Sequence, residues 1–369
     1  MKIIKIICDR CGKEIEGNPY MFYVNEIGRD SGDITDSVTI EKVIIHFLDL
    51  SMPEPVLSNF PTALDDDSED YLKAHIVKAF NSDDTKKCAF ERDGFVSSNL
   101  PDVRHVFVEF SQELGRRFFG VMQDSGGVPS GDLIVLTLSI AGEDYLAAMK
   151  FNYKTSFIHD FRAVADTHSI NFVKHQGILP GKTAKIDEAF FVNIDTREVY
   201  VLEKKYEIGG VKDYYISSVI FGVTDNLSVK KQLETVRKVA ERVYEEHYGP
   251  TVNMKPKVAG LMCRELSNQT MFKMDNIFEN FSEEFPEAAS DFRAIADRLP
   301  VDTDARLPVP PSLVKRISRQ TIKSRHGIEV KIPVKVYDNP KAMEYVREPD
   351  GTLTLVIRDI DEGKEESRE

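Results

Sequence analysis

Apolar and polar positions recur along the chain with periods that predict both strands and helices. Two pairs of apolar runs each flank a short turn: residues 132–140 with 144–153, and residues 187–194 with 199–206. Such pairs are typical of β-hairpins. Residues 42–50 form a further apolar run, which predicts a buried strand.

Other segments have apolar side chains three or four residues apart, which is the spacing of a helix with one buried face. The clearest is 228–247, which begins at a serine and ends before Gly-Pro. Residues 105–122 have the same spacing, and residues 68–80 predict a shorter, capped helix. Two further helices are predicted at 267–281 and 284–298.

Changes in composition divide the chain into five segments. These are an N-terminal extension (1–37), an α+β core domain (38–225), a mainly helical segment (226–310), a basic C-terminal β unit (311–360) and an acidic tail expected to be disordered (361–369). The predicted fold class is α+β. We expect hairpins in a mixed or antiparallel sheet, flanking helices, a helical middle and a small final β unit.

The overall charge argues against a general binder of polyanions. The 369 residues carry a formal net charge of −13, whose mean field repels phosphate. No apolar run approaches the roughly 20 residues that span a bilayer. Four cysteines suit a reducing compartment. We therefore expect a soluble cytoplasmic protein that does not enter a membrane.

The distribution of charge changes this picture. Residues 312–341 contain eight Lys and Arg against two acids, a net charge of +6 that leaves −19 for the rest of the chain. A basic β unit of this kind fits the phosphate backbone of DNA without reading sequence. A solvated hairpin is the alternative. Helix 228–247 would extend the surface. The candidate DNA-binding residues are Lys315, Arg316, Arg319, Lys323, Arg325, Lys331 and Lys335.

The stretch 177–183, GILPGKT, ends like a phosphate-binding loop. Such a loop needs a glycine and four further residues before Gly-Lys-Ser/Thr, but only three residues separate Gly177 from Gly181. Pro180 removes a backbone N–H, and an apolar strand pattern follows in place of a helix. The sequence therefore predicts a turn before a strand.

Acidic residues leave one enzymatic alternative open. Asp187 and Glu188 are neighbours on a predicted strand, so they point to opposite faces and do not form a pair. Asp195 followed by Glu203 and Lys205 matches the layout of many nucleases, in which two carboxylates hold Mg²⁺. A solvated strand face is the simpler explanation of the same residues.

The N-terminal extension contains half of a zinc site. Cys8 and Cys11 have the Cys-x-x-Cys spacing that places two thiolates on one metal. The second pair is missing, so a complete site would need Cys88, Cys263 or His46, or a second subunit. Zinc is the one cofactor that these residues favour, and the alternative is no cofactor.

Several blocks of the chain carry a family resemblance: FVEFSQELGRRFF, GDLIVLTLSIAGEDYLAAMKFNYKTSFIH, HQGILPGKTAKIDEAFFVNI, YVLEKKY and YYISSVIFG. Their order and spacing resemble the bacterial nucleoid-associated protein family of the YejK/NdpA type. The ending GIEVKIPVKVY…DGTLTLVIRDI resembles that family's C-terminal β unit. The resemblance covers roughly residues 38–360, and the Cys8–Cys11 extension departs from it.

The resemblance implies a protein of the cytoplasm and nucleoid that binds double-stranded DNA with little sequence preference. It implies no catalysis and no cofactor. The leading hypothesis is thus a non-enzymatic DNA-associated protein. The alternatives are a metal-dependent nuclease using Asp195, Glu203 and Lys205, or a scaffold that reaches the nucleoid through partner proteins. A homo-oligomer is compatible with each of them.

Overall fold

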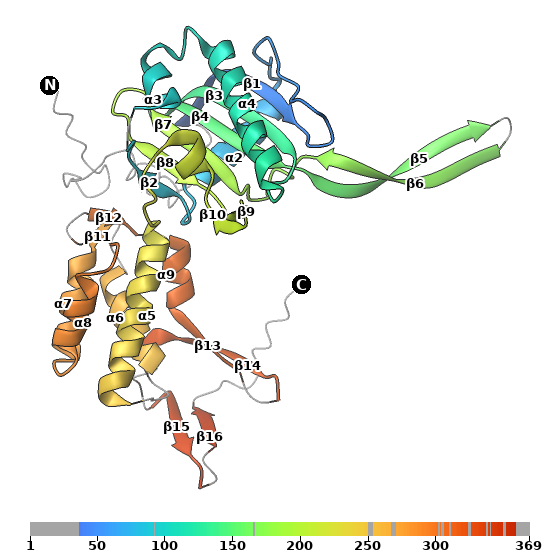
Figure 1. The fold of residues 1–369 in the computed structure, drawn as a ribbon. Helices are drawn as coiled ribbons and strands as arrows, with labels where there is room; N and C mark the ends of the chain where they lie inside the picture. Colours follow the sequence, from blue (N-terminus) through green and yellow to red (C-terminus); the bar gives the residue numbers. More distant parts are fainter. Residues whose placement is uncertain are drawn as a thin grey trace. The chain divides into compact units, whose positions relative to one another are not determined.

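The computed structural model contains two compact units, one up to Ser228 and one from Val229 onward (Figure 1). The residues it describes are 37–91, 93–164, 167–249, 254–266, 271–301, 303, 306–309, 311–323, 326–336, 339, 341–349 and 352–358. Cys8, Cys11 and Arg325 lie outside the described residues.

The first unit is built on a six-stranded antiparallel sheet with the order β1-β3-β4-β7-β8-β2. Both predicted hairpins, β3–β4 and β7–β8, are present, and β1 is the strand predicted near 42–50. The strands are β1 (Val38–Leu48), β2 (Lys86–Cys88), β3 (Gly131–Ile140), β4 (Glu143–Asn152), β7 (Glu188–Asn193) and β8 (Val199–Leu202).

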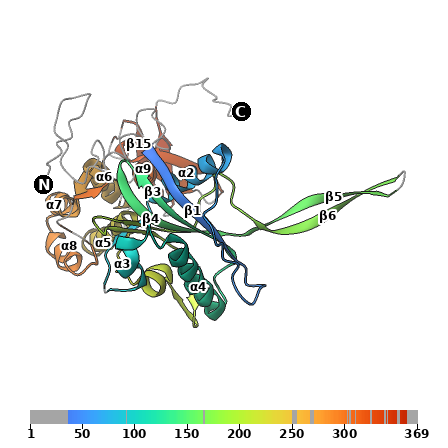
Figure 2. The ribbon, with the colours of Figure 1, turned by 90° about the horizontal axis from the view of Figure 1, so that it is seen from above.

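Both faces of this sheet are buried, because successive apolar residues of a strand point to opposite sides. On β3, Leu133 belongs to the core beneath helix α4 (Phe107–Ser125), whereas its neighbour Ile134 belongs to the core beneath α2 (Asp66–Phe80). Figure 2 shows the two helices on opposite sides of the sheet. Their cores explain why β3 and β4 have almost continuous apolar runs.

Shorter elements complete the first unit. They are α3 (Phe95–Asn99), η2 (Leu100–Asp102), β9 (Tyr206–Ile208), β10 (Val211–Asp213) and a π-helical turn, η3 (Ile216–Phe221). The strand predicted at 199–206 is therefore shorter than expected. It ends at Leu202, because Glu203 turns its carboxylate to the backbone N–H of Ser217 at 2.9 Å.

Between β4 and β7 a two-stranded ribbon projects from the sheet, as Figures 1 and 2 show. It consists of β5 (Lys154–Val164) and β6 (Thr167–Ile178), and the sequence pattern had not predicted it. The register shifts between Lys154 and Ser156, opposite Gly177, whose φ of 91° favours glycine. This bulge marks the point where the ribbon leaves the sheet. We call β5–β6 the arm.

Among its described residues, the second unit packs five helices around an apolar core that includes Leu233, Phe278 and Phe292. They are α5 (Val229–Tyr248), α6 (Met254–Leu266), α7 (Met274–Glu284), α8 (Ala289–Ala296) and α9 (Pro311–Ile317). The smaller elements are β11 (Met271–Lys273), β12 (Arg306–Pro308), β13 (Arg319–Lys323), β14 (Glu329–Pro333), η4 (Val334–Val336), β15 (Met343–Arg347) and β16 (Leu353–Ile357).

The predicted helix 267–281 is partly wrong, because α7 begins at Met274 after the short strand β11. Helix α6 was not predicted at all, since Pro256 and Gly260 lower its helix propensity. Gly260 allows close packing: a Cβ placed there would lie 3.2 Å from Val334 Cγ1 of η4. The predicted helical segment (226–310) and the predicted basic β unit (311–360) thus contact each other within the second unit. Among the described helices, none has the length and apolarity to cross a membrane.

Candidate nucleic-acid interface

The hairpin β13–β14 has basic side chains on one face and apolar side chains on the other. Its register pairs Thr321 with Lys331, so Lys331 shares a face with Arg319 and Lys323. The opposite face has apolar side chains, of which Ile332 is only 5% exposed. The alternating sequence therefore gives the hairpin one basic face and one apolar, partly buried face.

Helix α9 ends directly before this hairpin and adds Lys315 and Arg316, both exposed. A pocket of about 130 Å³ lies beside them. Three guanidinium groups line it, and guanidinium forks match the oxygens of a phosphate. Its lining residues are Leu233, Glu234, Arg237, Met262, Leu313, Arg316, Ile317 and Arg319. Glu234 pairs with Arg316, so the pocket is basic but not purely cationic.

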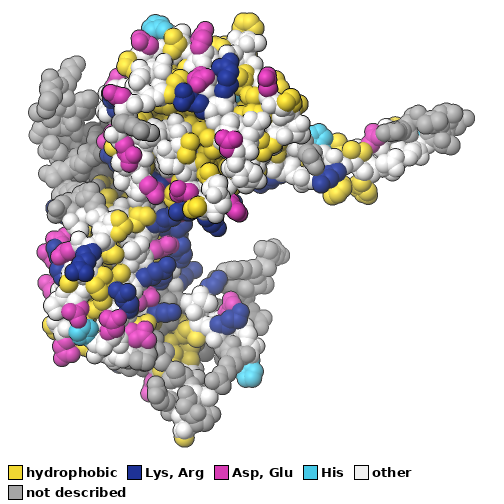
Figure 3. Space-filling model, viewed as in Figure 1, with side chains coloured by type: hydrophobic (Ala, Val, Ile, Leu, Met, Phe, Trp, Pro, Cys, Tyr) yellow, Lys and Arg dark blue, Asp and Glu magenta, His cyan; other side chains and the backbone are white. Residues whose placement is uncertain are grey.

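Lys335 follows β14 on η4. The N–H of its neighbour Val334 donates to Ser318 O at 2.8 Å, which keeps η4 beside the start of β13. We call the lysines and arginines of α9, β13, β14 and η4 the basic surface. Figure 3 shows Lys and Arg side chains gathered over this part of the second unit. The basic surface consists of Lys315, Arg316, Arg319, Lys323, Lys331 and Lys335.

Most of the basic surface lacks a counter-charge. No described carboxylate lies within salt-bridge distance of Lys315, Arg319, Lys331 or Lys335. Lys323 meets Glu329 at 3.1 Å, and both side chains are more than half exposed, so this pair contributes little energy. Exposed cations without acidic partners are available to an external anion.

The structure does not bring together the two carboxylates of the nuclease alternative. Asp195 is exposed in the β7–β8 turn, whereas Glu203 follows the far end of β8. The four residues of β8 separate the two carboxylates by roughly 13 Å along the strand. Two carboxylates at this distance do not share one Mg²⁺ ion.

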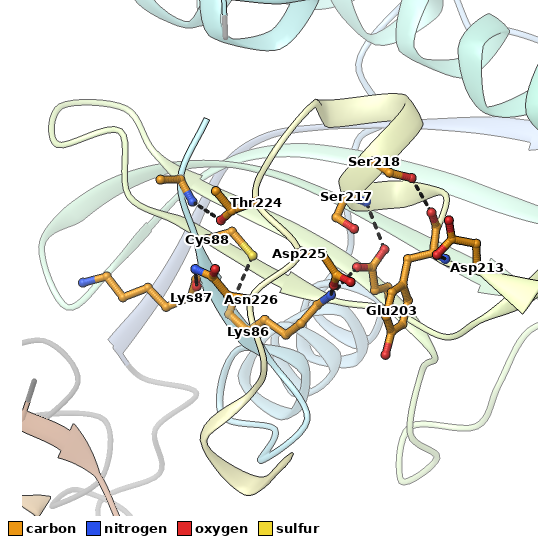
Figure 4. A network of polar contacts seen from close by, with 12 residues as sticks. Lys86, Lys87, Cys88, Glu203, Asp213, Ser217, Ser218, Thr224, Asp225 and Asn226 are labelled. Carbon is orange, nitrogen blue, oxygen red and sulfur yellow. Dashed lines mark hydrogen bonds and ion pairs between the residues drawn. The ribbon is translucent and has the colours of Figure 1, made fainter. Parts of the chain in front are cut away.

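Glu203 instead belongs to a buried ion pair in the first unit (Figure 4). Lys86 Nζ lies 2.7 Å from Glu203 and 2.6 Å from Asp225, and it sits 3.9 Å from the centre of the Tyr214 ring. Burial lowers the pKa of Lys86, but Glu203 and Asp225 outweigh it and the pKa is raised. The ammonium group thus occupies the place between two carboxylates where a cation would bind. Lys205 lies over the same ring at 4.6 Å.

A second buried pair was missed by the sequence analysis. Lys150 and Glu188 lie opposite each other on β4 and β7, both side chains 0% exposed, with Nζ and Oε2 3.3 Å apart. Lys150 also donates to Pro129 O at 2.7 Å and to Asn152, so each of its three donors has an acceptor. Tyr215 donates to Glu188 at 3.0 Å. Asp187 is exposed whereas Glu188 is buried, so the two neighbours point to opposite sides, as predicted.

The GILPGKT stretch leads from the end of β6 into a turn before strand β7, as predicted, and this turn contacts helix α2. Tyr71 donates to Pro180 O at 2.7 Å, and Lys78 donates to Lys182 O at 2.7 Å. Lys182 itself pairs with Asp70 of α2. Strand β7 follows in place of a helix, so the stretch has no helix N-terminus to hold a phosphate.

Of the residues proposed to complete a zinc site, Cys88 and His46 belong to the first unit and Cys263 belongs to the second. Burial raises the pKa of the Cys88 thiol to about 11 and that of Cys263 to about 11, which disfavours the thiolate that zinc needs. His46 is buried in β1, where its Nδ1 accepts from Ser58 N at 3.1 Å. Within the part of the chain that the structure describes, no three His, Cys, Asp or Glu side chains form a metal site.

Comparison with known proteins identifies a family for this chain. The family model of nucleoid-associated protein YejK matches residues 44–363, which span both units. A search of curated proteins finds no match. A match over most of the chain identifies a family, and the antiparallel sheets with helices confirm the predicted α+β class. The chain belongs to the nucleoid-associated protein YejK family.

Proposed function

We propose that this protein binds double-stranded DNA non-specifically through the basic surface, without catalysis, in the bacterial cytoplasm at the nucleoid. The observation that carries the proposal is the shared face of Arg319, Lys323 and Lys331 beside the arginine-lined pocket. Membership of a nucleoid-associated family supports it. The residues of this surface are exposed lysines and arginines, which are side chains that contact phosphate oxygens in protein–DNA complexes.

The dimensions of the hairpin fit a DNA backbone. Arg319 and Lys323 are four residues apart on β13, which corresponds to roughly 13 Å at 3.3 Å per residue. A strand of duplex DNA carries one phosphate per roughly 3.4 Å of helix axis, so this face spans about four phosphates. The acidic remainder of the chain would orient the protein with its negative surface away from DNA.

The triple variant Arg319→Ala, Lys323→Ala and Lys331→Ala is expected to bind duplex DNA more weakly. Each lost phosphate contact lowers the slope of log affinity against log salt by about 0.9, so the slope should fall in magnitude by about 3. Fluorescence anisotropy with a mixed-sequence duplex over a range of salt concentrations measures both quantities.

A matched control shows whether weaker binding depends on where the positive charges lie or only on how many are removed. Arg116, Lys185 and Lys212 are exposed residues of the first unit, and their triple alanine variant removes the same charge. It should leave the salt slope unchanged. Equal slopes for both triple variants and the unchanged protein would contradict the proposed surface. No binding to duplex even at low salt would favour recruitment by a partner protein.

Plasmid DNA incubated with the protein and Mg²⁺ is expected to remain intact. The ammonium of Lys86 already pairs with both Glu203 and Asp225, so a metal ion would have to displace a buried cation. Gel electrophoresis of supercoiled plasmid detects a single nick. Nicking that disappears in a Glu203→Ala variant would show that the protein is an enzyme and that the non-catalytic part of the proposal is wrong.

A further inference from the structure

The arm has one face made of large apolar side chains. Its register places Phe157 opposite Lys174, His159 opposite Phe172, and Phe161 opposite Ile170. These alternate pairs project to the same side of the ribbon. The four apolar members are well exposed: Phe157 67%, Phe161 57%, Ile170 69% and Phe172 84%. We call this side the aromatic face.

The opposite face of the arm is more polar. It contains one exposed apolar pair, Ile158 and Val173, at 46% and 41% exposure. The remaining described side chains on this face are Ser156, Asp160, Ser169, Asn171 and His175. The arm is thus amphipathic, and its aromatic face is the apolar side. Figure 3 shows hydrophobic side chains exposed on the arm.

An amphipathic ribbon of this kind needs a partner for its apolar side. A two-stranded hairpin alone is at best marginally stable in water, because it lacks a core. Elsewhere in the first unit, apolar strand residues such as Leu133 and Ile134 lie under helices and are buried. Contiguous exposed apolar side chains rimmed by polar ones mark interaction surfaces.

We propose that the aromatic face is the interface through which two copies of this chain form a symmetric dimer, arm against arm. A two-fold interface uses the same patch on both subunits, so the patch must complement itself. The aromatic face does, because it is apolar at its centre. The ribbon runs from the Lys154–Ile178 pair to the Val164–Thr167 pair, and His159–Phe172 lies midway.

The position of the patch favours antiparallel crossing of the arms. The apolar residues cluster around the midpoint pair, so two arms crossing in opposite directions superpose their patches about a two-fold axis. Lys174 lies toward the base of the arm, and this crossing keeps the two Lys174 ammonium groups apart. Crossing in the same direction would bring them together in a low-dielectric contact.

The exposed area of the aromatic face reaches the size that a specific dimer interface needs. At about 200 Å² for each large side chain and the exposures given above, the aromatic face offers about 500 Å² per arm. Two arms would bury about 1,000 Å², the lower limit for a specific interface. DNA is a poorer occupant, because Lys174 is the one lysine or arginine that this face carries among its described residues.

The first experiment compares two matched double variants of the full-length protein. Ile170→Thr with Phe172→Thr changes the aromatic face, and Ile158→Thr with Val173→Thr changes the other face. Threonine keeps the strand propensity. Sedimentation equilibrium should show twice the 41.9 kDa chain mass for the unchanged protein and the control, and a shift to monomer for the aromatic-face variant. A monomeric unchanged protein, or a dimer insensitive to the aromatic-face variant, would overturn the proposal.

The second experiment tests the two-fold arrangement by cross-linking. His159→Cys places a thiol at the midpoint of the aromatic face, and Ser156→Cys places one on the other face. With mild oxidant, the first should give a covalent dimer on a non-reducing gel, and the second should not. Equal cross-linking by both, or by neither, would rule out arm-to-arm packing at this face. Loss of DNA binding without loss of dimer in the aromatic-face variant would assign the face to DNA.

Discussion

Replacing Glu188 by glutamine is expected to lower the free energy of unfolding of the first unit by about 3–5 kcal/mol, because the change leaves a buried lysine without its counter-charge. Lys150 and Glu188 are both fully buried between strands β4 and β7. Burial already lowers the pKa of Lys150, and the glutamine removes the carboxylate that opposes this effect. The remaining acceptors, Pro129 O and Asn152, are neutral.

The neighbouring residue supplies the control. Asp187 is the adjacent acid on the opposite face, where its side chain is 49% exposed and 3.9 Å from Lys204. Asp187→Asn should cost less than about 0.5 kcal/mol, as most exposed ion pairs do. The two variants lose the same charge one residue apart, so the difference between them reports burial alone.

A double-mutant cycle tests whether the pair acts as a unit. Lys150→Met with Glu188→Gln removes both charges and keeps an acceptor for Tyr215. It should be more stable than Glu188→Gln alone, because no buried charge remains unpaired. Urea unfolding followed by circular dichroism suits this chain, which has no tryptophan. A cost below about 1 kcal/mol for Glu188→Gln would show that the pair is not ionised.

The sequence predicted those features that depend on local periodicity. The apolar runs of β3 and β4 lie on either side of a two-residue turn, and their pairing follows directly. Likewise, the alternation of Arg319, Thr321 and Lys323 predicts a common face before the partner strand is known. The apolar residues of helix α5 recur with a helical period, and the helix predicted at 228–247 agrees with the observed Val229–Tyr248.

Features that depend on pairing between segments far apart in the sequence could not be predicted from the sequence. Lys150 and Glu188 are 38 residues apart because the arm is inserted between their strands, and they meet because β4 pairs with β7. Asp195 and Glu203 are closer in sequence but are held apart by β8. The arm itself has a period-two apolar pattern, and such a pattern predicts a buried face. Only the fold shows that this face lies outside the core of its own chain.

Stability is expected to fall as the pH drops from 7 to 5, because two histidines are buried in the neutral form. The structure lowers the pKa of His46 to about 4, by burial and then by Arg116, and that of His75 to about 4, by burial and then by Lys78. His75 packs edge-on against Tyr71 and Phe151, with ring centroids 4.7 and 4.9 Å apart. Neither of its ring nitrogens has a hydrogen-bond partner among the described residues.

The direction of this change in stability with pH follows from proton linkage. An unfolded histidine titrates near pH 6.5, so below that pH the unfolded chain binds protons that the folded chain excludes. The stabilisation is therefore complete above pH 6.5 and is lost toward pH 4. Each histidine should cost about 2 kcal/mol between pH 7 and pH 5. Urea unfolding at a series of pH values measures the loss.

Variants at both positions should flatten this pH dependence. His46→Asn keeps an acceptor for Ser58 N, and His75→Phe suits the aromatic neighbours of that ring. The double variant should lose about 4 kcal/mol less stability than the unchanged protein over this interval. His105 is exposed, so His105→Asn should leave the curve unchanged. If the double variant and the unchanged protein lose equal stability, buried histidines do not cause the acid sensitivity, and the carboxylates must.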